Sequence, residues 1–504
     1  MEPSFSLTIC VLSLVFITLL SKLGPAPRFK VISKLSIYGS LGVALYLDST
    51  RGLIDGFSTL LGYTTILTGL PVSVYTLYYS RMEGYGEGLD ALMDCFIILV
   101  AMTYTAPNIL AMAVAWTVAE VVGWYLITMG EAHSVEGSLR SARGFLVTST
   151  LTFEISVFTV VMVSVLTTVA AMASANIGLL MEPFTALKPF SGVGLYLVPF
   201  LIIGFITKAA NIPLHFWLPG AHSAAPAPAS AVLSGLMTLL GFYGLYRVLH
   251  IVDLTRYYTV IAAVIATLGA SSVIYGWTQI AVQRDGKKLL AYATIATNGY
   301  ISLVFALYLL NPSGMAEDLL KLSILMHATY KTTLFAEVGL IEAVYGTRYI
   351  HGVRGLSRIL PLSSIGGLLA VLTLIGVPGT IGFTVKALSV YYIVSGTLDP
   401  GRALVLLGFT IYIASSAYLA IKYMSIYFNT PRPVLPEEPK KPPKPLELSI
   451  LALGSSNIYI PLVASVFLNG LRSSVLILSA VSPLTLLVTL LVYATVARTG
   501  GVKH

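Results

Sequence analysis

Long apolar segments follow one another along almost the whole chain, and they limit the folds that it can adopt. Each segment approaches or exceeds the roughly 20 residues with which a helix crosses the hydrocarbon core of a bilayer. A membrane-spanning barrel would instead alternate polar and apolar residues in segments of about ten. Only 10% of the 504 residues are charged, against roughly 25% in soluble domains. The sequence therefore predicts an all-α polytopic membrane protein with about fourteen or fifteen transmembrane helices in a lipid bilayer.

The first apolar segment, residues 5–20, is predicted to be a transmembrane helix and not a secretory signal. Only Met1, Glu2 and Pro3 precede it, so a basic leader is lacking. No small-residue cleavage site follows it, as a secretory signal would require. We therefore count it as the first helix.

The basic residues indicate how the chain crosses the membrane. They gather mainly in five predicted loops, at residues 28–34, 140–143, 284–288, 348–358 and 432–444. If the odd-numbered helices run inward, all five loops lie on one side, which the positive-inside rule assigns to the cytoplasm. We therefore expect a multi-pass protein of the cell membrane with its N-terminus outside. The net charge of +8 reflects this topology and implies no nucleic-acid partner.

One segment, residues 429–446, is too rich in proline to form a helix. Its prolines and charged residues favour an extended, semi-rigid conformation. We predict a cytoplasmic connector there, followed by C-terminal transmembrane helices within residues 447–504. A docking strip for a peripheral partner is an alternative function of the same charged surface.

Two apolar segments contain helix breakers beside polar residues, a pattern that marks ion sites in transporters. In one segment Gly204 and Lys208 precede Pro213, and in the other Pro378 precedes Lys386. The lysine comes before the proline in the first segment and after it in the second. An inverted-topology repeat would produce this order.

Four charged residues are predicted to lie deep in the membrane: Glu120, Lys208, Lys331 and Lys386. Glu120 has about nine residues of apolar helix on either side, and an ionised side chain there costs roughly 2.5–3.5 kcal/mol. At a separation of about 10 Å and an effective dielectric constant of about 20, two unit charges interact by roughly 1.7 kcal/mol. Altering one charge would then load or release a proton at its neighbour. The alternatives are a protonated or structurally paired Glu120 and snorkelling or structural lysines.

Histidines are secondary candidates, because their side chains titrate near neutral pH. His215 and His222 flank residues 217–219 near the first helix break, where they would either shuttle protons or act as ordinary hydrogen-bonded loop residues. His327 lies one helical turn from Lys331 on the same predicted face. Weaker candidates, each of which could be interfacial or loop-facing, are Glu154, Glu337 and Glu342.

Several sequence motifs carry a family resemblance over roughly residues 100–430. They are Phe216–Gly235 (FWLPGAHSAAPAPASAVLSG), Gly286–Tyr300, His327–Phe335, Gly355–Pro361 and Gly376–Lys386. In this order they resemble the antiporter-like membrane subunits of respiratory complex I, membrane-bound hydrogenases and Mrp-type multisubunit cation/proton antiporters. The chain ends soon after its last apolar segment, so it looks more like the shorter subunits, of the M/N or hydrogenase type.

The resemblance implies a particular arrangement of helices. Helices 1–3 would lie within residues 1–88, and two inverted five-helix repeats would span residues 89–252 (helices 4–8) and 253–428 (helices 9–13). Helices 7 and 12 would be broken in the membrane. A line of charged residues would run along the membrane midplane through both repeats.

The resemblance also implies roles for the buried charges. Glu120 matches the family's glutamate on the fifth helix, and Lys208 matches the lysine paired with it. Lys331 matches the central lysine, and Lys386 the terminal lysine on the broken twelfth helix. Leu239 departs from the family, which usually places a lysine or histidine there. The link between Lys208 and Lys331 would then need water, Thr238 or another hydroxyl.

Taken together, these features predict an ion-translocating subunit, for protons or sodium ions, of a redox-driven assembly such as a membrane-bound hydrogenase or dehydrogenase. By resemblance, its partners would be other membrane subunits and a peripheral redox arm on the cytoplasmic side. This chain would hold no cofactor and no redox active site, and iron–sulfur clusters would reside in partner subunits. The alternatives are a subunit of an Mrp-type Na⁺/H⁺ antiporter without redox chemistry and a structural membrane scaffold.

Overall fold

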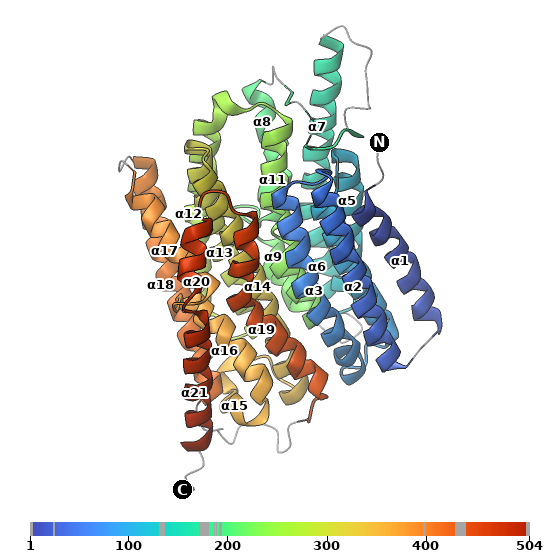
Figure 1. The fold of residues 1–504 in the computed structure, drawn as a ribbon, viewed down its shortest axis with the longest axis vertical. Coiled ribbons are helices and arrows are strands. Elements are labelled where there is room, and N and C mark those ends of the chain that lie inside the picture. Colours follow the sequence, from blue (N-terminus) through green and yellow to red (C-terminus); the bar gives the residue numbers. More distant parts are fainter. Residues whose placement is uncertain are drawn as a thin grey trace.

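The computed structural model describes residues 4–23, 26–130, 137–170, 181–396 apart from residues 186, 188 and 191–193, 400–428 and 440–499. It is a bundle of helices that run up and down between two ends (Figure 1). The longer helices are α1 (Phe5–Leu23), α2 (Pro27–Thr50), α3 (Gly56–Met82), α4 (Glu87–Tyr104), α5 (Ile109–Thr128), α7 (Leu151–Ala170), α12 (Tyr258–Val282), α13 (Gly286–Leu310), α14 (Gly314–Tyr345), α18 (Pro400–Phe428), α19 (Lys444–Ala464) and α21 (Ser482–Thr499). The shorter helices are α6 (Ser138–Phe145), α8 (Val198–Lys208), α9 (Trp217–Ala224), α10 (Ala227–Val232), α11 (Leu240–Ile251), α15 (Leu356–Ile359), α16 (Pro361–Ile375), α17 (Ile381–Val394) and α20 (Arg472–Ser479).

Within the described ranges, nine helices are long and apolar enough to cross a membrane, and four shorter helices are also apolar. Short π-helical segments join α6 to α7 and α10 to α11 within two of the nine spans, and α20 and the first part of α21 together make up another. Three further helices, α2, α4 and α14, are 24, 18 and 32 residues long. They carry four, three and six charged residues, respectively. The prediction of a helical, multi-pass membrane protein is therefore confirmed.

Side chains that bind free backbone groups set several helix boundaries. The carboxylates of Asp55 and Asp285 accept hydrogen bonds from the first turns of α3 and α13. Asn108 caps α5 and Ser313 caps α14 in the same way. These residue types are the preferred N-caps, since they satisfy amide groups that have no partner inside the helix. At its other end α14 stops at Gly346, which adopts the left-handed conformation that favours glycine.

Two spans are interrupted in the middle. Helix α8 ends at Lys208, and the helix resumes only at Trp217 with α9. Helix α16 ends at Ile375, and α17 begins at Ile381. The predicted helix breaks are therefore present in both segments. Such breaks leave main-chain carbonyls unpaired inside the bundle, where charged groups can reach them.

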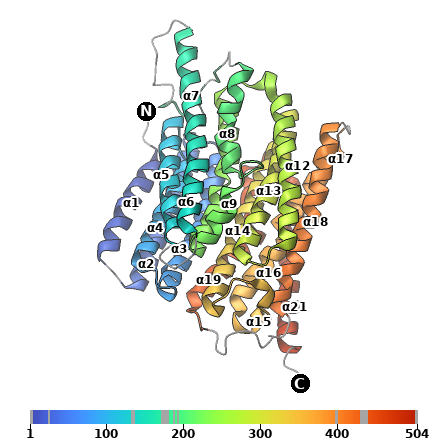
Figure 2. The ribbon, with the colours of Figure 1, turned by 180° about the vertical axis from the view of Figure 1, so that it is seen from behind.

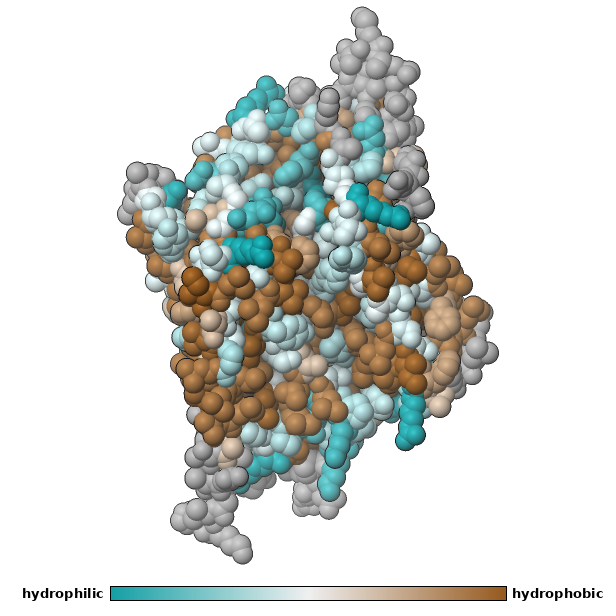
Figure 3. Space-filling model, in the orientation of Figure 1, coloured by the Kyte–Doolittle hydropathy of each residue, from teal (hydrophilic) through white to brown (hydrophobic). Residues whose placement is uncertain are grey.

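Close helix contacts and an apolar surface adapt the bundle to lipid. Helices α12 and α13 pack side by side (Figure 2), and Gly269 of α12 lies against Gly299 of α13. A Cβ atom on Gly269 would lie only 2.7 Å from the carbonyl oxygen of Gly299. Small residues allow this close approach, as at helix interfaces in membranes. Figure 3 shows a broad hydrophobic band across the middle of one face, with hydrophilic residues toward the two ends.

The predicted basic loops need correction or lie partly outside the described residues: residues 286–288 already belong to α13, and residues 356–358 belong to α15. Residues 28–34 belong to α2, and residues 140–143 belong to α6, so neither segment is a loop. Most of the predicted proline-rich connector, residues 429–439, lies outside the described ranges. Helix α19 begins at Lys444, so the connector ends before the predicted boundary at residue 446.

Candidate functional site

Glu120 and Lys208 form an ion pair in the interior of the first half of the bundle. Lys208 Nζ lies 2.7 Å from Glu120 Oε1, and both side chains are completely buried. Glu120 lies in the middle of α5, whereas Lys208 is the last residue of α8. The pair therefore joins an unbroken helix to the end of a broken one. Such a pair persists in an apolar interior only if both charges find additional polar partners.

A π-helical segment supplies these polar partners. Residues 146–150 form a π-turn, η2, between α6 and α7. Ser149 Oγ lies 3.1 Å from Glu120 Oε1 and 3.3 Å from Lys208 Nζ, so one hydroxyl contacts both members of the pair. Thr150 Oγ1 donates to Glu120 Oε2 at 3.3 Å, and Trp116 Nε1 donates to Oε1 at 3.0 Å. π-turns occur frequently at functional sites.

Aromatic rings enclose the ammonium group of Lys208. Its Nζ lies 4.8 Å from the ring centre of Phe145 and 5.6 Å from that of Trp217. Ring faces attract cations, and this attraction strengthens when water is excluded. The pair is thus buried between α5, α6, α8 and α9, with two aromatic rings beside the ammonium group.

Lys331 lies in the interior near the middle of α14, and it contacts no carboxylate within the described ranges. Its Nζ donates to the main-chain carbonyl of Leu290 at 2.7 Å and lies 5.3 Å from the ring centre of Tyr330. His327, one turn earlier, points to a different neighbour. Its Nε2 donates to the carbonyl of Ser234 at 3.1 Å, because a carbonyl can only accept. The two side chains therefore connect α14 to two different helices.

His222 lies between the helix of Lys208 and the helix of Lys331. It is completely buried in α9, and its ring is 4.9 Å from that of Phe335, which lies one turn after Lys331. Neither ring nitrogen of His222 has a hydrogen-bond partner within the described ranges. Buried polar atoms without protein partners are positions where water binds. His222 is thus a titratable group between two buried amines.

The other secondary candidates differ in their surroundings. His215 is only partly buried in the turn before α9, with its ring 4.6 Å from that of Tyr275. Thr238 is buried, but its hydroxyl donates to the carbonyl of Ser234 in the preceding turn. Leu239 follows the π-turn η5 (Leu233–Met237) and is fully buried. The bundle therefore places an apolar side chain where the family resemblance leads one to expect a basic one.

Lys386 lies at the second broken helix in a different arrangement. It extends from α17 to the C-terminal end of α16, where its Nζ donates to the carbonyls of Leu374 and Ile375. It also donates to Ser416 Oγ of α18 at 2.9 Å. The C-terminal end of a helix carries a partial negative charge, which favours a cation there. Lys386 is thus held by main-chain dipoles and a hydroxyl, whereas Lys208 is held by a carboxylate.

The three glutamates considered weaker candidates occupy distinct positions. Glu154 accepts a hydrogen bond from Thr117 at 2.7 Å. Glu342 forms an ion pair with Lys287 at 2.9 Å and is partly exposed. Glu337 is completely buried, which excludes the interfacial or loop-facing position considered for it. The apolar residues around Glu337 in the sequence gave no sign of the polar groups that meet it from other helices.

A second buried charge cluster was not anticipated from the sequence. Lys34 of α2 lies 2.9 Å from Asp90 Oδ1 and contacts Asp94 closely, and both acids belong to α4. Ser73 of α3 donates to Asp94, and Lys30 lies 3.8 Å from Asp90. The one-turn spacing of the two acids and of the two lysines was the available signal. This cluster ties together α2, α3 and α4.

Removing the cation from this cluster is expected to destabilise the fold. Lys34→Met leaves the buried Asp94 carboxylate without an ammonium partner and Asp90 with only Lys30 at 3.8 Å, which lowers the free energy of unfolding by about 3–5 kcal/mol. The double variant K34M/D94N removes the charges of Lys34 and Asp94, leaves Asp90 with Lys30 at 3.8 Å, and regains most of this loss. Unfolding of the detergent-solubilised protein measures both effects. Lys288→Met, at an exposed position of α13, is the control and changes stability by less than about 0.5 kcal/mol. A Lys34→Met variant that is as stable as the wild type would contradict the role of this cluster in stabilising the fold.

Comparisons with known proteins agree with this architecture. Residues 106–413 match the family model described as "NADH:quinone oxidoreductase/Mrp antiporter, TM". The chain is 28% identical over 414 residues to a probable K(+)/H(+) antiporter protein of Rhizobium meliloti (strain 1021), covering 79% of this chain and 39% of that protein. It is 25% identical over 433 residues to hydrogenase-4 component B of Escherichia coli (strain K12), covering 82% and 62%.

A solved structure shows the same fold. A chain of the Mrp complex from Dietzia sp. DQ12-45-1b superposes with a TM-score of 0.74 at 16% identity, and the match covers 98% of this chain and 99% of that one. The curated relatives, by contrast, are longer than the part they share with this chain, which spans less than two thirds of their length.

Proposed function

Because this chain belongs to the NADH:quinone oxidoreductase/Mrp antiporter transmembrane family, we propose that it is an ion-translocating, antiporter-like membrane subunit. Our leading proposal is a subunit of a complex I-related, redox-driven assembly, such as a membrane-bound hydrogenase or dehydrogenase. The amines and carboxylates of its interior exchange protons, so protons are the ions that these residues would move. Sodium ions are the alternative coupling ion.

The fully buried pair of Glu120 and Lys208 is the observation that carries the proposal. Its two atoms are 2.7 Å apart, with Ser149 in contact with both. Breaking the pair leaves each charge unpaired in a low dielectric, so separation of the pair and transfer of a proton are energetically linked. A change that draws Lys208 away would release its proton to the next acceptor. This coupling is what an ion pump requires.

The proton route continues from Lys208 toward Lys331. His222 and His327 support this step, since both are buried and each has a ring nitrogen without a protein partner within the described ranges. The two imidazoles would replace the basic side chain that the family usually places at the position of Leu239. We propose that water bridges these imidazoles. From Lys331 the proton would pass to Lys386, the gate toward a neighbouring subunit or the outside.

The overall arrangement belongs to the same proposal. We infer fourteen or fifteen transmembrane helices, with inverted repeats over residues 89–252 and 253–428 and an N-terminal group over residues 1–88. The broken pairs α8–α9 and α16–α17, one in each proposed repeat, support this division. The N-terminus would face outside the cell membrane. The end of the bundle that contains α15 would face the cytoplasm, in accord with the positive-inside rule.

We propose that redox chemistry takes place in partner subunits. A peripheral arm on the cytoplasmic side would hold the iron–sulfur clusters, and other membrane subunits would flank this chain. This subunit would bind no redox cofactor of its own. This subunit would couple movements of the neighbouring subunits to the transfer of protons between its buried charged residues.

Transport by the purified assembly tests the proposal. The tagged chain is purified with its companions, which mass spectrometry identifies, and the assembly is placed in liposomes containing a pH-sensitive dye. Adding hydrogen or NADH should change the internal pH, and a protonophore should abolish the change. A pH that remains constant both with electron donors and with an imposed sodium gradient would exclude proton translocation.

The same experiment tests the second candidate, a subunit of an Mrp-type Na⁺/H⁺ antiporter. The similarity to a protein named as part of a probable antiporter favours it. It predicts companions without redox centres and proton movement driven by a sodium gradient alone. The third candidate, a structural scaffold, predicts near-normal coupled transport after simultaneous neutralisation of Glu120, Lys208 and Lys386.

A further inference from the structure

Glu337 is a completely buried carboxyl group that the proposed route from Glu120 to Lys386 does not use. It lies in α14, and no cation lies within ion-pair distance of it in the described part of the chain. Its Oε2 accepts a hydrogen bond from Tyr427 at 2.7 Å, and its Oε1 lies 3.5 Å from Ser363 Oγ. On α16 it faces Gly367, where a Cβ atom would lie only 2.1 Å from Oε2. The lack of a side chain at Gly367 therefore leaves space for this carboxyl group.

A buried carboxyl group without a cation is suited to exchange a proton. The ionised form would carry an uncompensated charge, which is costly in an apolar interior. Two hydroxyl groups reduce this cost for the time that the ionised form exists. A purely structural role would be served by a neutral amide of the same size, and this difference can be tested.

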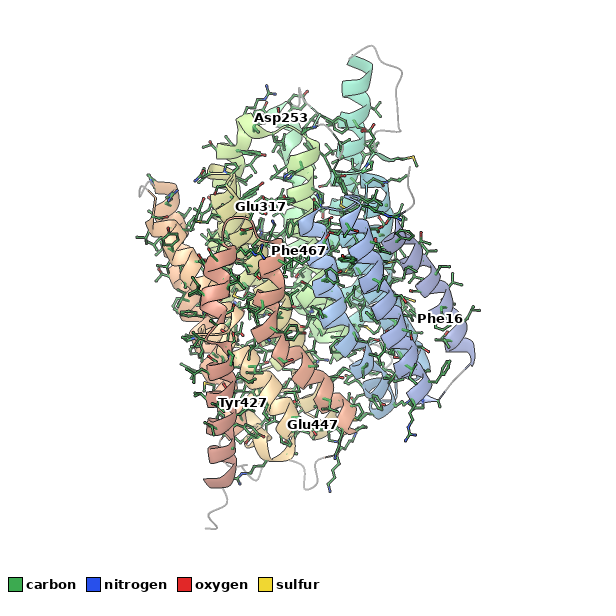
Figure 4. All side chains as sticks on the ribbon, in the orientation of Figure 1. Phe16, Asp253, Glu317, Tyr427, Glu447 and Phe467 are labelled. Carbon is green, nitrogen blue, oxygen red and sulfur yellow. The ribbon has the colours of Figure 1, made fainter. Side chains whose placement is uncertain are left out.

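Polar groups connect Glu337 to one end of the bundle. Ser363 lies in the first turn of α16, and its amide and that of Leu362 donate to Glu447 of α19 at 3.5 and 3.1 Å. Glu447 is 9% exposed. Figure 4 shows Glu447 and Tyr427 toward the end of the bundle opposite Asp253. Ser363 thus contacts both a carboxylate near the surface and the buried carboxyl group.

A stripe of hydroxyl groups on α18 connects Glu337 to the second helix break. The stripe consists of Tyr412, Ser416, Tyr423 and Tyr427, all of them buried. Their spacings of four, seven and four residues place them on one face of the helix. Tyr427 donates to Glu337, and Ser416 accepts from Lys386 at 2.9 Å. One face of α18 therefore contacts both titratable groups.

Two helices independently give the distance between these groups. Tyr427 and Ser416 are eleven residues apart in α18, which corresponds to about 16 Å of helix. Ser363 and Leu374, which contact Glu337 and Lys386 from α16, are also eleven residues apart. Between the two ends, the hydroxyl of Tyr423 has no hydrogen-bond partner within the described ranges. Water bound to this hydroxyl would bridge the gap.

We propose that Glu337 is a proton-carrying residue, and that the hydroxyl stripe of α18 forms a second half-route from the end of the bundle near Glu447 to Lys386. This inference rests on the proposed transport function. It assigns to Lys386 a second supply of protons besides the route through Lys208 and Lys331, and net transport requires both supplies. The second half of the bundle would then load its terminal lysine directly.

The proton transfers balance at each step. A proton from water at the Glu447 end binds the Glu337 carboxylate and gives the neutral acid. The O–H bond of this acid then breaks, while each hydroxyl or water along the stripe accepts one proton and donates another. The last of these protons binds the neutral amine of Lys386. Glu337 is left as a carboxylate and Lys386 as an ammonium ion, and no electrons are exchanged.

Glu337→Gln tests the proposal in the reconstituted assembly. The amide keeps the size of the side chain and can still accept the hydrogen bond from Tyr427, but it carries no proton. We expect proton transport to fall by about tenfold or more, with partial recovery in Glu337→Asp. The infrared carbonyl band of a protonated carboxyl group should be present in the wild type and lost in the Gln variant. Wild-type transport by Glu337→Gln would overturn the inference.

Two tyrosine variants separate the hydroxyl stripe from general effects on α18. Tyr423→Phe removes only the unpaired hydroxyl and should lower the transport rate several-fold, while Tyr418→Phe, on a partly exposed face of the same helix, should leave it unchanged. Equal rates in both variants would contradict the stripe. If Glu337→Gln does not elute as a single species on gel filtration, Glu337→Asp and Tyr423→Phe decide the question.

The outcome for Lys208→Ala distinguishes this inference from the proposed function. Loss of transport in Lys208→Ala together with normal transport in Glu337→Gln rejects only the second half-route. Normal transport in both variants rejects the proposed transport mechanism itself. Loss of transport in both, with normal transport in Tyr418→Phe, supports both proposals.

Discussion

Replacing Lys208 with alanine abolishes proton transport and lowers the free energy of unfolding by about 3–5 kcal/mol. The variant leaves the Glu120 carboxylate buried, with hydrogen bonds from Trp116, Ser149 and Thr150 but with no cation. Electron transfer by the partner subunits should continue in part, because no redox group depends on this side chain. Dye-based transport assays and unfolding in detergent measure the two effects separately.

A double variant separates loss of the charge from loss of the fold. In E120Q/K208M, the amide keeps the hydrogen bonds to its neighbours, and methionine fills the volume left by the lysine. Replacing a buried ion pair by groups of similar volume is often neutral for stability. The double variant should therefore unfold close to the wild type and still transport no protons. Transport at the wild-type rate in this stable variant would remove the pair from the mechanism.

Replacing Lys386 with arginine abolishes transport while the fold is retained. Arginine can still donate to the carbonyls of Leu374 and Ile375 at the end of α16, but it does not release its proton in proteins. Lys386→Met, in contrast, loses both transport and these hydrogen bonds. Unpaired buried acceptors cost about 1–3 kcal/mol, so only the methionine variant should unfold earlier. Transport by the arginine variant would show that Lys386 never gives up its proton.

The chain offers a matched control for this substitution. Lys422 of α18 also caps a helix end, since its Nζ donates to the carbonyls of Ile280 at 2.6 Å and Ala281 at 3.0 Å at the end of α12. It lies outside the proposed proton route. Lys422→Arg should therefore leave both stability and transport at wild-type levels. A loss of transport in this control would indicate that arginine at a helix end disturbs the bundle in general.

The sequence was informative wherever the signal was local. Apolar length predicted the helices, and glycine and proline beside lysines predicted the two breaks, because backbone preferences depend on neighbouring residues. Glu120 stood out because a charge in a long apolar segment is costly in a membrane. Its pairing with Lys208 came from the family resemblance, since the two residues lie far apart in the chain.

Contacts between distant segments could not be predicted in the same way. Lys34 was read as a loop residue because its carboxylate partners, Asp90 and Asp94, lie more than fifty residues later. Glu337 was underestimated because its partners, Ser363 and Tyr427, come from two other helices. Serine and tyrosine are common in apolar helices, so neither marks a polar site by itself. Packing of the bundle determines which hydroxyls meet which charges.

Lys386 donates to main-chain carbonyls of α16, so this contact does not depend on which side chains α16 carries. No side-chain replacement within residues 370–375 removes a carbonyl oxygen, so this stretch should tolerate many apolar substitutions. The positions that should not tolerate substitution are Gly376 and Gly379. Their φ angles of +85° and +87° turn the chain away after the last helical residue, and residues with a side chain rarely adopt such angles. Saturation mutagenesis with selection for transport should therefore show a permissive helix followed by two intolerant glycines.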